Sequence, residues 1–330
     1  MTRPLLARIL AALLAALPLP ATAETDPAFA AIYDGVLQAD AEGAVAACTG
    51  VQAAIAGGDA PARLAAFTGL ATAWGRVQTA YVLGGYDMDA TDYPLLIDYF
   101  HSGKEDIPKS IERIIAGTGT PDTALYKNSY RTMTALDAAM FAGDWTPRRA
   151  EISTAIAQTV CTRLALLRDG YATHREDFLA DPDKALGLTV NALIENLYKT
   201  REWRIAMVAG LTRETVGQYL PQNQQYPFSQ ASWAVVGAIL DTYARLLDDD
   251  SQPNLATLAH NRQAEDGLAE IQAALAETRA AYAATPPEAA FALKETVPIF
   301  AGLQDMQKAF YDHLVLALGI SAVLIDADGD

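Results

Sequence analysis

Apolar side chains recur at spacings of three and four residues along most of this chain, which is the period of one face of an α-helix. The clearest stripe runs through 147–179 and consists of Ile152, Ile156, Val160, Leu164, Leu167 and Tyr171. Strand-like alternation is scarce, whereas alanine is abundant and turn signals separate the periodic segments. The pattern therefore predicts an all-α protein.

Capping residues, glycines and prolines mark where the helices begin and end. Asp26 is the expected cap of the first helix, Pro27 takes its first position, and Gly57 follows its end. Pro298 is expected to kink or restart the last helix. The expected helices cover about 27–56, 61–84, 107–116, 130–142, 147–179, 186–210, 228–247, 254–282 and 286–317.

The sequence Asp181-Pro182-Asp183 interrupts the helical pattern near the middle of the chain. We take it as the boundary between an N-terminal helical bundle, 24–181, and a C-terminal helical bundle, 182–330. Each half has several helices of a length suited to an antiparallel bundle, and no repeat of fixed period relates the halves. We expect two packed antiparallel helical bundles that together form one unit.

The first 23 residues have the features of a secretory signal peptide. Arg3 and Arg8 supply the positive charge, a short apolar run follows at 9–17, and Ala21-Thr22-Ala23 is a cleavage site of the A-x-A type. The apolar run is too short to span a bilayer, and no later run is longer. We expect a mature protein that begins at Glu24, is periplasmic and does not span a membrane.

The cysteine content fits that compartment. In an oxidising environment an even number of cysteines indicates a disulfide. The chain has two, Cys48 and Cys161, both on expected helices of the first half. We expect a bond between them, and two free buried thiols are the alternative.

The charge balance is strongly acidic, with 24 Lys and Arg against 40 Asp and Glu and a formal net charge of −16. Such a surface repels nucleic acid phosphates, so we expect no nucleic acid partner. It is compatible with bound cations, although solubility alone explains most of these acids. Asp87, Asp89 and Asp92 form a D-x-D-x-x-D loop whose oxygens are suitable ligands for a hard divalent cation. A solvated turn is the alternative.

One acid, Asp137, lies on the apolar side of the helix expected within 130–145. Met133 and Leu136 recur at helical spacing beside it, and Thr134 lies within one turn. A buried carboxylate needs a hydrogen-bond donor, a cation or a proton. Asp137 is therefore a candidate binding or metal-ligating residue. The alternative is a surface acid, or one bonded to a nearby helix end.

The same stretch resembles the central segment of imelysin-like proteins, the M75 peptidase family, in which the motif G-x-H-x-x-E precedes a short apolar run that ends in Phe. Thr132, Thr134 and Asp137 stand at the Gly, His and Glu positions of the motif, and Phe141 ends the run. The acid character and the frame are kept, whereas the histidine is not.

Two further segments resemble the same family, so the resemblance covers most of the mature chain. Residues 73–78, which include Trp74, are similar to an early helix of the family, and 202–247 is similar to its second half. The resemblance implies two related helical bundles with a site between them. It also implies a metal-dependent peptidase activity and a link to iron acquisition.

The candidate ligand site consists of Thr132, Thr134 and Asp137, with Trp74 as a wall and 217–227 as a rim. These residues also have ordinary structural interpretations. Trp74 continues an apolar stripe, which is typical of a core residue, and the threonine hydroxyls are able to bond helical carbonyls.

The available metal ligands do not favour catalysis. No H-E-x-x-H occurs, and none of the four histidines has another within one turn. Thr134 offers a neutral hydroxyl where the family has histidine. We therefore interpret the chain as an exported, non-catalytic ligand-binding protein, whose link to iron or another divalent metal comes from the resemblance. An M75-type peptidase and an interaction module for other envelope proteins are the alternatives.

Overall fold

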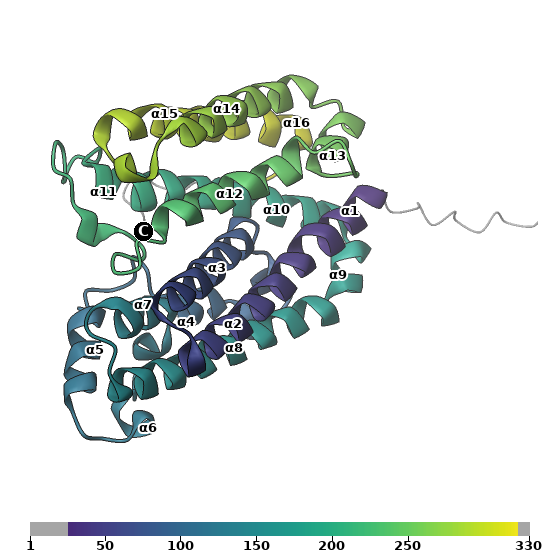
Figure 1. The fold of residues 1–330 in the computed structure, drawn as a ribbon. Helices are drawn as coiled ribbons and strands as arrows, with labels where there is room; N and C mark the ends of the chain where they lie inside the picture. The colour runs from purple at the N-terminus through teal and green to yellow at the C-terminus, as the bar shows by residue number, and fades with distance from the viewer. Residues whose placement is uncertain (1–25, 323–330) are drawn as a thin grey trace, which may run out of the picture.

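A computed structural model describes residues 26–322. Every regular element within this range is a helix, which confirms the predicted all-α fold (Figure 1). Across the same residues, no helix combines the length and the apolar character needed to cross a membrane. The predicted signal peptide, 1–23, lies outside the described residues.

The helices divide into a first group, α1 to α9, and a second group, α10 to α16. The first group is α1 Pro27–Ile32, α2 Ala39–Gly57, α3 Ala60–Thr79, α4 Tyr93–Ile97, α5 Ile107–Ala116, α6 Pro121–Ala124, α7 Met133–Phe141, α8 Pro147–Thr173 and α9 Arg175–Ala180. The second group is α10 Pro182–Tyr198, α11 Met207–Ala209, α12 Ser232–Leu247, α13 Leu255–Asn261, α14 Glu265–Ala284, α15 Leu293–Ala309 and α16 Val315–Leu318. Segments of π-helix occur at η1 Tyr33–Gln38, η5 Lys199–Ala206 and η8 Phe310–Leu314.

The helix starts follow the capping rules. The side chains of Asp26 and Asp106 accept hydrogen bonds from first-turn N–H groups of α1 and α5. Asp181 caps α10 in the same way, so this helix begins at Pro182, earlier than expected, because proline suits the first helical position. α15 begins at Leu293 and continues through Pro298, so the helix does not restart there.

The two groups pack one above the other in the view of Figure 1. In the first group α2 lies against α3 and α8, and α7 lies against α5 and α8. In the second group α14 lies against α15 and α12. α12 also packs on α3, and this contact joins the groups. The division into an N-terminal bundle, 24–181, and a C-terminal bundle, 182–330, stays a prediction.

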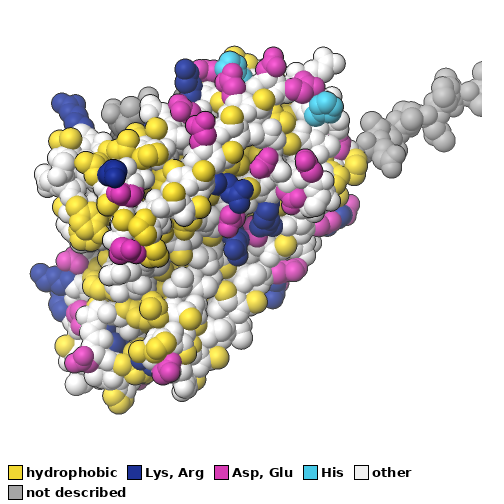
Figure 2. Space-filling model, turned by 45° about the horizontal axis from the view of Figure 1, so that its top comes forward, with side chains coloured by type: hydrophobic (Ala, Val, Ile, Leu, Met, Phe, Trp, Pro, Cys, Tyr) yellow, Lys and Arg dark blue, Asp and Glu magenta, His cyan; other side chains and the backbone are white. Residues whose placement is uncertain are grey.

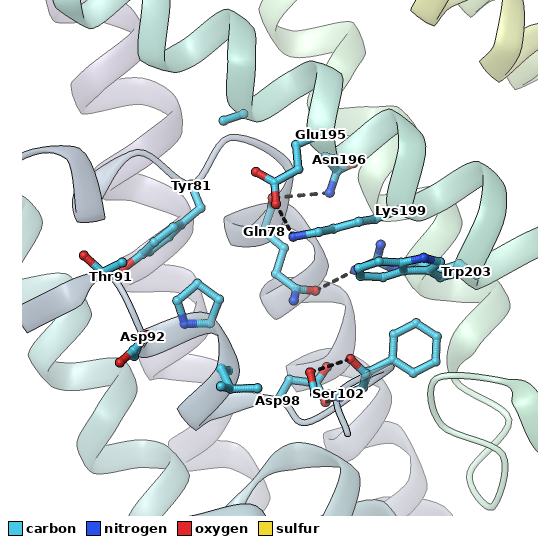
Figure 3. Close-up of a pocket in the computed structure, with 15 residues that line it drawn as sticks. Gln78, Tyr81, Thr91, Asp92, Asp98, Ser102, Glu195, Asn196, Lys199 and Trp203 are labelled. Carbon is cyan, nitrogen blue, oxygen red and sulfur yellow. Dashed lines mark hydrogen bonds and ion pairs between the residues drawn. The ribbon is translucent and has the colours of Figure 1, made fainter. Parts of the chain in front are cut away.

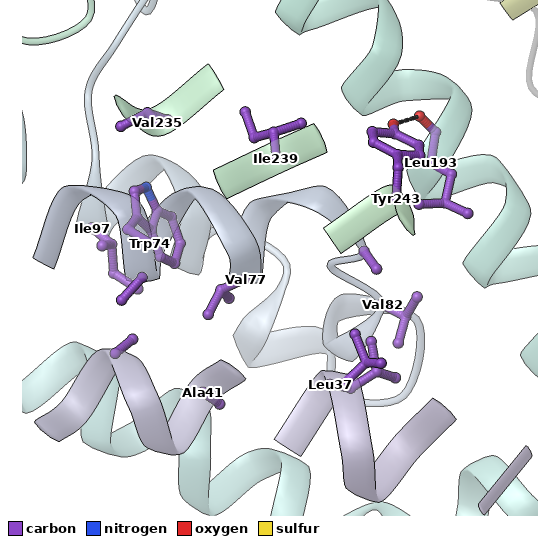
Figure 4. Packing of buried hydrophobic residues seen from close by; sticks show 14 of the residues in the cluster. Leu37, Ala41, Trp74, Val77, Val82, Ile97, Leu193, Val235, Ile239 and Tyr243 are labelled. Carbon is purple, nitrogen blue, oxygen red and sulfur yellow. Dashed lines mark hydrogen bonds between the residues drawn. The ribbon is translucent and has the colours of Figure 1, made fainter. Parts of the chain in front are cut away.

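The contact between α3 and α12 is apolar and close. Trp74 and Val77 of α3 are buried near Val235 and Ile239 of α12 (Figure 4). A Cβ atom added at Gly75 would lie 2.9 Å from Cγ1 of Val235. Because carbon atoms pack best at about 3.5–4.0 Å, glycine is what lets these two helices approach.

We expect Gly75→Ala to lower the free energy of unfolding by about 1–3 kcal/mol, because the added methyl group overpacks the contact with α12. Gly69→Ala on the exposed side of α3 is the matched control, since a Cβ there meets no atom within 4 Å. That control should stabilise the helix by up to about 1 kcal/mol. Denaturant titration measures both, and equal effects at the two positions would contradict the close approach.

A disulfide ties two long helices of the first group together. Cys48 of α2 and Cys161 of α8 are bonded, with Cα atoms 5.6 Å apart, which confirms the predicted pair. The bond joins residues separated by 113 positions. A cross-link over so long a loop restricts the unfolded chain and so favours the folded state.

Candidate functional site

Asp137 lies on α7 and is 1 % exposed. Its carboxylate accepts hydrogen bonds from the backbone N–H of Phe228 at 3.1 Å and of Ser229 at 3.0 Å. Both donors belong to the segment that leads into α12, so the bonds cross between the two groups. Burial raises the pKa of Asp137 to about 6, and the bonds to these two residues oppose this rise.

A second buried carboxylate, Asp98, lies just after α4. Its Oδ1 accepts bonds from Thr134 Oγ1 at 2.7 Å and from the Phe100 N–H at 3.3 Å. Its Oδ2 accepts bonds from Gln225 Nε2 at 2.7 Å and from the Tyr226 hydroxyl at 2.8 Å. A carboxylate offers about four acceptor positions, so this one is saturated by the protein.

Thr132 and Trp74 have structural roles. Thr132 caps α7, where its Oγ1 accepts from the N–H of Ala135 at 3.4 Å and donates to the carbonyl of Ser129 at 3.0 Å. Trp74 is fully buried in the core drawn in Figure 4. None of Thr132, Thr134, Asp137 and Trp74 lines the cavity described below.

Arg204 continues the buried network from the second group and is 3 % exposed. Its Nε donates to Gln225 Oε1 at 2.9 Å, and its Nη2 donates to Gln78 Oε1 at 2.9 Å. Its Nη1 is shielded from solvent and has no hydrogen-bond partner among the described residues. Burial lowers the pKa of Arg204 and nearby Asp98 opposes this, but an arginine stays charged in a protein.

Arg204 lines a cavity of about 330 Å³ between the two groups (Figure 3). The first group contributes the end of α3 and the segment around α4, and the second group contributes α10 and η5. The lining residues are Gln78, Tyr81, Thr91, Asp92, Pro94, Leu95, Asp98, Phe100, Ser102, Ala192, Glu195, Asn196, Lys199, Trp203 and Arg204. The wall therefore combines aromatic rings with charged and amide groups.

The π-helix η5 explains why this wall has so many functional groups. A π-helix closes its turn with i→i+5 hydrogen bonds, so Lys199 and Arg204, five residues apart, lie on about the same side of it. Trp203 lies next to them, with Lys199 Nζ 5.5 Å from its ring centroid. The ring of His101 lies 4.3 Å from that of Trp203, and this contact also joins the two groups.

The cavity has a mixed charge. Asp92, Asp98 and Glu195 are its acids, and Lys199 and Arg204 are its bases. Lys199 forms an ion pair with Glu195. On the face drawn in Figure 2, acidic side chains are dispersed, with Lys and Arg among them. The acidity of this face therefore fits solubility better than it fits a single cation-binding patch.

The predicted metal residues do not converge. Asp87 accepts a bond from the N–H of Asp89 at 2.9 Å and so caps a short turn. Between residues 26 and 322, no three His, Cys, Asp or Glu side chains gather in a way that could hold a metal ion. At the motif, Asp137 is bonded to backbone N–H groups and Thr134 offers a neutral hydroxyl. These residues do not fit a divalent metal or iron.

Four residues of the network were missed in the sequence analysis, namely Asp98, Arg204, Gln225 and Tyr226. Gln225 and Tyr226 end the segment expected as a rim, but this segment contributes no lining residue and lies in the network instead. Asp98 and Arg204 have the signal that singled out Asp137, which is an ionisable residue beside apolar ones. That signal finds buried charges but does not show which of them meet.

The comparisons with known proteins agree with this fold. The imelysin family model, of the M75 peptidases, matches residues 29–315. The chain belongs to the imelysin family. A crystal structure of an imelysin-like protein from Psychrobacter arcticum 273-4 aligns with this chain at a TM-score of 0.74 and 17 % identity. The alignment covers 90 % of this chain and 96 % of that chain. No curated protein matches the sequence.

The pKa of Asp137 predicts a pH dependence of stability. Because this pKa is raised from 3.8 to about 6, the folded protein binds more protons than the unfolded chain between those values. The contribution of Asp137 to the free energy of unfolding should therefore fall as pH rises from 4 to 7, by about 2 kcal/mol. The unfolding free energy of the wild type minus that of Asp137→Asn should show this fall in denaturant titrations.

Asp305→Asn is the control for this experiment, because Asp305 is an exposed acid on α15. Subtracting its free energy of unfolding from that of the wild type should give a nearly constant value over the same range. A difference for Asp137→Asn that is flat, or that increases with pH, would contradict the raised pKa.

Proposed function

We propose that this imelysin-family protein is an exported, non-catalytic protein that binds a small ligand in the cavity between its two helical groups. A volume of about 330 Å³ is within the range of small-molecule sites. The cavity has aromatic and aliphatic side chains that suit an apolar body, together with many polar and charged groups that can orient a ligand.

The observation that carries this proposal is that the motif side chains are held in hydrogen bonds, whereas the cavity beside them keeps polar and aromatic groups on its wall. Thr134 and Asp137 are engaged by Asp98 and by backbone N–H groups. A metallopeptidase needs several metal ligands around an open position, and the described residues gather no such set at the motif. The cavity beside them keeps Arg204 and Trp203 on its wall. This arrangement supports binding rather than peptide hydrolysis.

We expect a screen of small organic solutes, iron and other divalent metals to yield compounds that raise the melting temperature, because a ligand of the native state stabilises it. Ala192 lines the cavity, so Ala192→Trp should fill the space and abolish that rise. The control is Ala180→Trp at the exposed end of α9, which should leave the rise intact. Equal responses in both variants would place the ligand elsewhere, and metal-dependent peptide cleavage would contradict a non-catalytic role.

Export is part of the same proposal, and the signal-like residues 1–23 and the Cys48–Cys161 bond support it. We expect the protein expressed with its full sequence in a Gram-negative bacterium to be recovered from the periplasm with Glu24 at its N-terminus. Intact mass and N-terminal sequencing measure this. Recovery from the cytoplasm with residues 1–23 still attached would contradict export.

A further inference from the structure

Arg204, on the wall of the cavity, has unused hydrogen-bond donors. Arg204 carries five N–H hydrogens, of which one on Nε and one on Nη2 are used. Nη1 has no partner among the described residues and is shielded from solvent. An unsatisfied buried donor destabilises the folded protein, and more so when it is charged.

The neighbouring acid does not relieve this shortage. Asp98 provides the nearest opposite charge, but all its acceptor positions are taken by four other donors. Gln78 and Gln225 each contribute one amide oxygen to the guanidinium. An amide has no net charge, so these two residues hold the guanidinium in place without neutralising it. The group that completes the site must therefore bring an acceptor.

We propose that the ligand of this cavity is a small organic acid whose carboxylate binds the guanidinium of Arg204. The inference rests on the proposed function, and it names the chemical class of the ligand. A guanidinium binds a carboxylate through two parallel hydrogen bonds in one plane, and this geometry favours planar carboxylates. Asp92, Asp98 and Glu195 surround the same space, and their charges favour a singly charged carboxylate over a doubly charged phosphate.

The rest of the wall fits an apolar or aromatic body for this acid. Pro94, Leu95, Phe100 and Trp203 line the cavity. The guanidinium carbon of Arg204 lies 5.9 Å from the centroid of the Phe100 ring. A flat ring attached to the carboxylate would therefore lie among aromatic and aliphatic side chains while its acid group meets Arg204.

The test compares acids with their primary amides, because each pair has nearly the same shape and differs in charge. We would measure the binding of benzoate and benzamide, and of 3-phenylpropionate and its amide, to the full mature protein by calorimetry and thermal shift. Each acid should bind about ten- to hundredfold more tightly than its amide, as expected for one charged hydrogen-bonded pair. Ala192→Trp should remove binding of both.

Arg204→Met should reduce the acid-to-amide ratio to about one. The matched control is Arg201→Met, because Arg201 lies on the same π-helix but bonds Glu202 and Gln307 outside the cavity. Arg201→Met should keep the full acid-to-amide ratio. If Arg204→Met does not fold, Arg204→Lys replaces it and should lose part of the acid-to-amide ratio. The comparison of each acid with its amide on the wild-type protein tests the inference in either case.

Three results would overturn the inference. The first is equal affinity for an acid and its amide, the second is a ratio that survives in folded Arg204→Met, and the third is tighter binding of phenyl phosphate than of benzoate. If these acids do not bind but neutral solutes stabilise the protein in a way that Ala192→Trp abolishes, the inference fails and the proposed function stands. If no solute of any class acts through the cavity, both fail.

Discussion

The saturated carboxylate of Asp98 is the interaction on which the rest of the site depends. Its four donors come from its own loop, from α7 and from the segment before α12. Leaving a buried hydrogen-bonding group without a partner costs about 1–3 kcal/mol, and more when the group is charged, so each donor has to stay in place. Burial and Asp98 together raise the pKa of Tyr226, which keeps its hydroxyl protonated as a donor. Through Gln225 the same network holds Arg204 at the cavity.

This network also accounts for the altered motif. Thr134 has a short side chain that reaches Asp98 at 2.7 Å, and Asp137 receives two backbone N–H groups from the other helical group. The bonds of Asp137 fix one group of helices against the other, whereas the bond between Thr134 and Asp98 lies within the first group. Under the proposed function, these side chains hold helices in place instead of supplying the chemistry of a histidine and a free acid.

Local rules predict most of the fold, because helix periodicity and caps act over a few residues. The bounds of α5 and the cap of the first helix follow from Pro108 and Asp26, and the cysteine pair follows from its count and compartment. The need of Asp137 for a donor is also visible in the sequence. The sequence does not show which groups are the donors, because they are backbone N–H groups at 228 and 229, and no side chain marks them. The π-helix that turns Lys199 and Arg204 to one side has no local signal either.

Arg204 is costly to bury and is only partly satisfied, so its place needs a reason beyond stability. A neutral side chain of similar length would avoid desolvating a charge, and Gln78 and Gln225 could then bond other groups. Their bonds instead hold the guanidinium in one orientation at the wall of a cavity. A binding group that is already ordered loses little entropy when its ligand arrives. An ordered cation with free donors is a poor structural element, but it is a well-prepared receptor for an anion.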